Sequence, residues 1–178
     1  MCFLCLFVAN LFVLLCGPFS AFPRSFPRDK NMAHTVEDLL NMTDVQLDEL
    51  FANGTVDEIP SGEAKGTAIV ANSTRFSDEI AQFVNYFAWQ GKTFDPEEGV
   101  LRNRITHFGF NAIIAKVYKA PSWYDQKDCI VLDYSKTSLV ARWIRDEIRL
   151  IDPNLYLGRV YWGEKSLIHF ALEFPPQT

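Results

Sequence analysis

The chain is poor in cysteine and has no cluster of basic residues, and each of these absences excludes a class of protein. Three of its four cysteines lie within the first 16 residues. Cys129 is the remaining one, so a disulfide-stapled scaffold is excluded for the rest of the chain. The net charge of −5, without a run of Lys or Arg, argues against nucleic-acid binding, because a phosphate backbone requires a basic face.

Several motifs that carry chemistry are also missing. The three histidines, His34, His107 and His169, lack the close spacing of metal ligands. The stretch GKTF lacks the preceding glycines of a phosphate-binding loop, and no G-x-S-x-G nucleophile motif occurs. We therefore expect neither a metal ion nor a cofactor.

The first residues of the chain differ in composition from the remainder. Residues 3–16 are apolar apart from Asn10, a run too short for a membrane helix of about 20 residues but typical of a secretory signal peptide. The pattern predicts a signal peptide at 1–21, a flexible tether at 22–34 and a secreted protein without a membrane span in the mature chain. Translation from Met32 would instead give a cytoplasmic protein. A secreted chain would be a glycoprotein, with sequons at Asn41, Asn53 and Asn72.

Two helical stretches precede a long β-rich region. Residues 35–54 carry apolar side chains at helical spacing and predict one helix, or two short ones that break near Thr43. Thr35 is the expected N-cap, with Asp38 three residues on, and Gly54 is the expected stop. Residues 77–91 predict a further helix.

From Val100 onward, short β-rich runs alternate with turn-like stretches such as SKTS, DPN and GEK. Connections this short force neighbouring strands to be antiparallel, since a parallel pair needs a helix-length crossover. The sequence therefore predicts an α+β fold, with an antiparallel small β-barrel or strongly curled sheet and N-terminal helices, in a single domain at 35–178.

Two motifs resemble a known group of small barrels. WQGKTF, residues 89–94, is similar to the W-x-G-K-x-F pattern of GXWXG-type, calycin-like or lipocalin-like proteins, although the leading Gly-x of the full motif is absent. ARWIRDEIRLIDPNLYLG, residues 141–158, is similar to a strand–turn–strand near the end of such domains. The resemblance implies a β-barrel with an interior for a small ligand, and it implies no catalytic residues.

Side chains alternate along a strand, so parity sorts the charges of ARWIRDEIRLI. Arg145, Glu147 and Arg149 share one face, which we predict to be the solvated outer face of the sheet. Asp146 shares the other face with apolar side chains such as Ile148. We therefore expect an inward carboxylate, which requires a cation or hydrogen-bond donors.

The same alternation predicts cationic and phenolic side chains near Asp146, with Arg159 and Lys116 as the expected cations. The loop KAPSWYDQKD and the stretch THFGF add aromatic and imidazole groups near a barrel mouth, although loop aromatics can equally fold back on the core. The set is either a structural ion-pair network or the polar lining of a ligand pocket. The expected ligand-binding residues are Tyr118, Trp123, Tyr124, Tyr134, Arg159, Tyr161, Lys116 and His107.

These features favour a binding barrel that holds an apolar or aromatic small molecule. The alternative is a cofactor-free lyase, isomerase or hydrolase acting on such a ligand. Asp146 or Asp133 would then be the general acid or base, its pKa raised by apolar walls. A third possibility is an interaction module without an internal cavity, whose helical part binds a partner.

Overall fold

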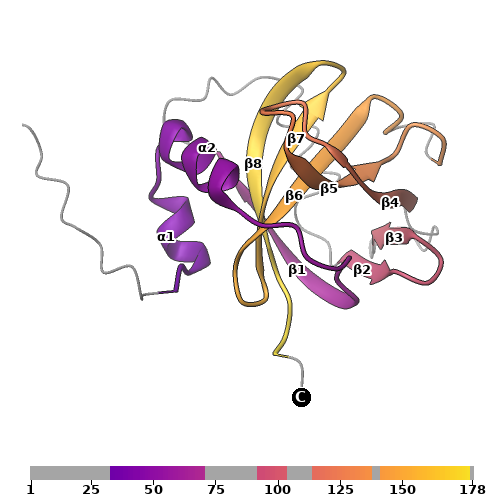
Figure 1. The fold of residues 1–178 in the computed structure, drawn as a ribbon, viewed down its shortest axis with the longest axis horizontal. Coiled ribbons are helices and arrows are strands. Elements are labelled where there is room, and N and C mark those ends of the chain that lie inside the picture. The colour runs from indigo at the N-terminus through magenta and orange to yellow at the C-terminus, as the bar shows by residue number, and fades with distance from the viewer. Residues whose placement is uncertain (1–32, 71–91, 104–113, 138–140, 177–178) are drawn as a thin grey trace, which may run out of the picture. The chain divides into compact units, whose positions relative to one another are not determined.

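The computed structural model describes residues 33–70, 92–103, 114–137 and 141–176. Eight antiparallel strands follow one another in chain order around a closed barrel, and the first strand pairs with the last (Figure 1). This architecture confirms the predicted α+β fold and selects the barrel over the open curled sheet. The strands are β1 (Gly62–Ile69), β2 (Lys92–Asp95), β3 (Val100–Asn103), β4 (Ile114–Pro121), β5 (Asp128–Asp133), β6 (Ile144–Asp152), β7 (Leu155–Trp162) and β8 (Lys165–Glu173).

Two short helices, α1 (Val36–Leu40) and α2 (Asp44–Asn53), precede the barrel. Each begins with a capping box, formed by Thr35 with Asp38 and by Thr43 with Gln46. The second helix ends at Gly54, as the sequence predicts. The prediction of two helices with a break near Thr43 is therefore confirmed, because a second capping threonine competes with helix continuation at that point.

The barrel has two apolar layers. The interior holds the larger cluster of buried side chains, which includes Phe94, Leu101, Leu132, Val160 and Phe170. A smaller cluster lies on the outside, where α1 and α2 pack against one side of the barrel (Figure 1). The members of this outer cluster are Leu39, Leu47, Phe51, Ile69, Leu155, Leu157 and Ala171.

The parity of β6 gives the predicted faces, but the outer face is not solvated. Asp146 is fully buried among the interior side chains, as expected. Glu147 and Arg149 lie on the outer face with exposed fractions of 0% and 1%, so the prediction that their charged groups remain in water is wrong. Helix α2 and the β4–β5 hairpin cover this face, and no local pattern in β6 reveals that cover.

The inward placements predicted for β4 and β7 are also wrong. In β4 the buried side chains are Ala115 and Val117, while Lys116 and Tyr118 are exposed on the outside. In β7 nearly every residue is buried, because the helices cover one face and the barrel interior the other. Its interior positions are Tyr156, Gly158, Val160 and Trp162, and so Arg159 and Tyr161 face outward.

Several predictions lie outside the described residues. They concern the leader, nearly all of the tether, the helix at 77–91, the tryptophan of WQGKTF, and His107. Within the parts of the chain that are described, no helix combines the length and the apolar character needed to cross a bilayer.

Candidate functional site

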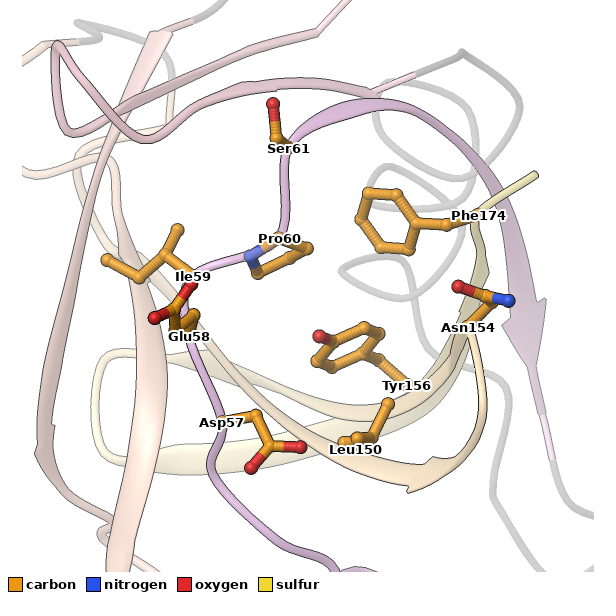
Figure 2. Close-up of a pocket in the computed structure, with 9 residues that line it drawn as sticks. All are labelled: Asp57, Glu58, Ile59, Pro60, Ser61, Leu150, Asn154, Tyr156 and Phe174. Atoms are coloured by element: carbon orange, nitrogen blue, oxygen red, sulfur yellow. The ribbon is translucent and has the colours of Figure 1, made fainter. Parts of the chain in front are cut away.

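A pocket of about 500 Å³ opens at one end of the barrel (Figure 2). The rings of Tyr156 and Phe174 form its aromatic wall, with ring centroids 5.4 Å apart. Phe174 also packs against Phe94 deeper in the barrel, so this wall is continuous with the interior core. The lining residues are Asp57, Glu58, Ile59, Pro60, Ser61, Leu150, Asn154, Tyr156 and Phe174.

Two backbone connections hold the walls of this mouth pocket in place. The segment after α2 pairs with the end of β6 through Thr55 and Leu150, which exchange N–H···O bonds of 2.8 and 2.9 Å. The Phe174 N–H donates to the Asn154 carbonyl at 2.9 Å and fastens the end of β8 to the β6–β7 turn. In that turn, Asn154 adopts φ 61°, a conformation that asparagine tolerates better than most residues.

The lining of the mouth pocket is mixed, because acidic and other polar side chains stand beside its aromatic and aliphatic ones. Asp57 and Glu58 lie on the segment that leads into β1, and the Asp57 carboxylate lies on the side of Leu150 in Figure 2. Burial, with a further contribution from the charge of Asp57, raises the pKa of Tyr156. The phenol therefore remains neutral and available as a hydrogen-bond donor.

Deeper in the barrel, four polar side chains from β2, β3, the residue after β5, and β6 form a network that we call the interior tetrad: Lys92, Asn103, Tyr134 and Asp146. Their exposed fractions are 3%, 1%, 0% and 0%. The Lys92 ammonium donates to Asn103 Oδ1 at 3.0 Å and to the Tyr134 hydroxyl at 3.3 Å. Asn103 Nδ2 donates to that hydroxyl at 3.4 Å, and the hydroxyl donates to Asp146 Oδ2 at 3.4 Å.

The ionisation of the tetrad is governed by its apolar surroundings. Burial raises the pKa of Asp146 to about 7, although the charge of Lys92 and the hydroxyl of Tyr134 offset part of the effect. Burial likewise lowers the pKa of Lys92, against the attraction of Asp146. Burial and the charge of Asp146 hold the pKa of Tyr134 well above its usual range. The pKa values of the carboxyl and the ammonium thus approach one another, as they do in sites that bind or transfer protons.

An aromatic side chain separates the mouth pocket from the tetrad. A Cβ on Gly158 would lie 2.3 Å from two carbons of the Phe170 ring, so this ring fills the space that a side chain at 158 would need. The Lys92 ammonium lies 5.9 Å from the centre of the same ring. Directly opposite residues on β6, β7 and β8 form layers of interior side chains. From the pocket inward, these layers are Leu150–Tyr156–Leu172, Ile148–Gly158–Phe170 and Asp146–Val160–Ile168.

Of the predicted ligand-binding residues that the structure describes, most lie outside the barrel, and Tyr134 alone joins Asp146 in the interior. Trp123 packs against Tyr161 with ring centroids 5.2 Å apart, and Tyr124 packs against Phe51 of α2. The β4–β5 hairpin therefore folds back on the outer face instead of lining the mouth pocket. Trp123 and Tyr124 remain 47% and 41% exposed.

Arg159 fastens α2 to the barrel. Its guanidinium pairs with Asp48 of α2, and His169 Nε2 lies 2.8 Å from the same carboxylate oxygen. Although burial acts in the opposite direction, these two neighbours hold the pKa of Asp48 below its usual value. A cavity of about 230 Å³ adjoins Asp48, Arg159 and His169 on this outer face. The expected pairing of Arg159 with Asp146 is therefore wrong, and its observed partners indicate a structural role.

Sequence reasoning missed Lys92 and Asn103, the two tetrad members on the shortest strands. Both β2 and β3 have four residues, too few for alternation to be recognised, and the pairing of Lys92 with Asn103 follows from the register between them. The mouth pocket was missed as well, because its residues come from four separate segments. Among the described residues, no group of three or more His, Cys, Asp or Glu side chains could hold a metal ion.

Comparison with known proteins supports the fold only. No family model matches the chain, and no curated protein matches it. A solved structure of a protein from Thermomonospora curvata is similar, with a TM-score of 0.53 and 12% sequence identity. The similarity covers 76% of this chain and 89% of that chain. At this identity the likeness supports a barrel-type fold.

Proposed function

We propose that the protein binds an apolar or aromatic small molecule in its barrel, with the mouth pocket as the binding place. The observation that carries this proposal is a pocket of about 500 Å³ that has the Tyr156 and Phe174 rings on one side. Ligand pockets typically measure about 300–1,000 Å³ and combine apolar walls with a few polar groups. The resemblance of WQGKTF to lipocalin-like barrels favours the same function.

The chemistry of the pocket favours a neutral or cationic aromatic compound over an anion. Aromatic rings of a ligand can pack edge-to-face on Tyr156 and Phe174, while the carboxylates of Asp57 and Glu58 at the rim disfavour a negative charge. A neutral aromatic probe is therefore the appropriate first ligand.

Titration with N-phenyl-1-naphthylamine, a neutral probe whose fluorescence rises in apolar surroundings, tests the proposal. We expect saturable binding by the wild-type chain. The variant Asp57→Trp should weaken it by about tenfold or more, because the indole competes for the pocket.

The matched control is Asp128→Trp, since Asp128 is also exposed but lies at the start of β5, away from the pocket lining. It should bind the probe as the wild type does. An equal loss of affinity for the probe in both variants, or no saturable binding by the wild type, would contradict binding in the mouth pocket.

A second candidate, a cofactor-free enzyme, is favoured by one observation. Asp146 Oδ1 has no hydrogen-bond partner among the described residues, and the pKa of this buried carboxyl is about 7, where a general base works near neutral pH. Asp133, the other candidate base, lies apart from the tetrad on the outer face, where it accepts a hydrogen bond from Tyr118.

Mass spectrometry of a bound compound after prolonged incubation separates the two candidates. An enzyme converts the compound, and Asp146→Asn abolishes the conversion while Asp133→Asn preserves it. A carrier returns the compound unchanged from all three proteins.

A further inference from the structure

The interior tetrad contrasts with Arg149 and Glu147, two buried charged residues on the outer face whose hydrogen bonds are short and complete. All five N–H groups of Arg149 are used, at donor–acceptor distances of 2.7–3.1 Å. The Glu147 carboxylate accepts from Ser122, Trp123 and Arg145 at 2.5–3.0 Å. These groups therefore satisfy one another and need no ligand.

Asp146 and Lys92 are bonded less completely. Among the described residues, three of the four hydrogen bonds that join the tetrad members measure 3.3–3.4 Å, at or beyond the long end of the usual range. Asp146 Oδ1 is buried without a partner among the described residues. The Lys92 ammonium has three N–H donors, of which two are used. A carboxylate acceptor and an ammonium donor thus remain available on the two sides of the Tyr134 hydroxyl.

We propose, as an extension of the proposed binding function, that the tetrad is the polar end of the ligand site and selects a molecule bearing a hydroxyl group, an alcohol or a phenol. A hydroxyl donates one hydrogen bond and accepts others, so it can donate to Asp146 Oδ1 and accept from Lys92 at once. A ketone or ether accepts from Lys92 but leaves Asp146 unpaired. An amine can donate to Asp146, but as a cation it is repelled by Lys92.

The apolar surroundings of the tetrad increase the free-energy cost of leaving Asp146 Oδ1 and the third N–H of Lys92 without hydrogen bonds. The residues that pair with Asp146 on the neighbouring strands, Leu132 and Val160, are apolar, and Lys92 faces Ala64 and the Phe170 ring. Among the described side chains, the charged and titratable groups around Asp146 are Lys92 and Tyr134. In this dry interior, a matching hydroxyl makes charge-assisted hydrogen bonds without competition from water.

A ligand that spans the mouth pocket and the tetrad displaces the Phe170 ring. The Phe170 ring belongs to the layer of side chains between the mouth pocket and the tetrad. It fits there because position 158 is glycine. The apolar body of such a ligand then occupies the aromatic part of the barrel, and its hydroxyl lies innermost.

Equilibrium dialysis of the full chain against two ligands of matched shape, 2-naphthol and 2-methylnaphthalene, tests the selection. We expect 2-naphthol to bind about tenfold or more tightly, although the methyl compound is the more hydrophobic, because hydrogen bonds to charged partners favour the hydroxyl. The double variant Lys92→Met/Asp146→Leu should bind the two compounds with equal affinity. Because both buried charged groups are replaced together by apolar side chains, neither charge is left uncompensated in the interior.

The matched control is Asp133→Asn, which removes an outward carboxylate and should retain the preference for 2-naphthol. Equal binding of the two compounds by the wild type, or a preference that survives in the double variant, would overturn the selection by the tetrad and leave the mouth pocket intact. Failure of the wild type to bind N-phenyl-1-naphthylamine would instead overturn the proposed function itself.

Discussion

Replacement of Arg149 by methionine is expected to lower the free energy of unfolding by about 3–5 kcal/mol, the cost of removing one partner of a buried ion pair. The guanidinium joins Asp125 with two bonds of 2.7 and 2.8 Å and also donates to the carbonyls of Phe51, Lys127 and Asp128. It thereby connects α2, the β4–β5 hairpin and β6. Without it, the carboxylate and three carbonyls each lose a hydrogen bond, and α2 loses one of its polar attachments to the barrel.

Urea denaturation measures this effect, and Arg102→Met is the control. Arg102 pairs with Asp95 and Glu98 on the barrel surface, where its side chain is 40% exposed, so its loss should change stability little. Arg149→Lys keeps the positive charge but lacks the planar guanidinium with its five N–H donors. We expect it to recover only a part of the lost free energy of unfolding. Equal stability of Arg149→Met and the wild type would show that this network does not hold the helices.

The stability contributed by Asp146 is expected to fall as the pH rises from 4 to 7. Burial raises the pKa of this carboxyl from 3.8 to about 7, so between these values the folded state binds a proton that the unfolded state has released. The protonated carboxyl is the form that the apolar interior favours, and its stabilisation is complete below pH 4. The loss up to pH 7 amounts to at most about 4 kcal/mol for a shift of this size.

The difference in unfolding free energy between the wild type and Asp146→Asn, measured by urea denaturation at intervals from pH 4 to 7, isolates this contribution. We expect the difference to move in favour of the variant as the pH rises. Asp133→Asn is the control, and its difference from the wild type should stay constant over this range. Although burial raises the pKa of Asp133, hydrogen bonds from Ser135 and Tyr118 lower it below its usual value. Its contribution is therefore present above pH 4 and lost as the pH falls. A pH-independent difference for Asp146→Asn would contradict the buried position of this carboxyl.

The barrel and the helices were predictable because their signals are local. Two threonines, each followed three residues later by Asp38 or Gln46, mark the two helix starts. Short turns such as Asp-Pro-Asn force antiparallel neighbours, and Asp146 between Ile144 and Ile148 indicates an inward carboxylate.

The partners of Asp146 were not predictable from parity. Arg159 and Asp146 belong to adjacent strands, but they lie on opposite faces, because Asp146 pairs with Val160. Lys92 is linked to the carboxylate through the Tyr134 hydroxyl, and strand registers set which of these side chains meet. Both faces of β7 are buried, because α2 covers its outer face. The strand therefore lacks the alternation of apolar and polar residues that would have indicated an outward Arg159. The mouth pocket depends on loops and turns that come together only in the folded chain.

The central claim, that an aromatic molecule binds at the barrel mouth, is tested most directly by nuclear Overhauser effects in the complex with N-phenyl-1-naphthylamine. We expect contacts between the naphthyl protons of the probe and the ring protons of Tyr156 and Phe174. Contacts confined to Trp123 and Trp143, whose side chains are 47% and 49% exposed, would place the probe on the outer surface and contradict it.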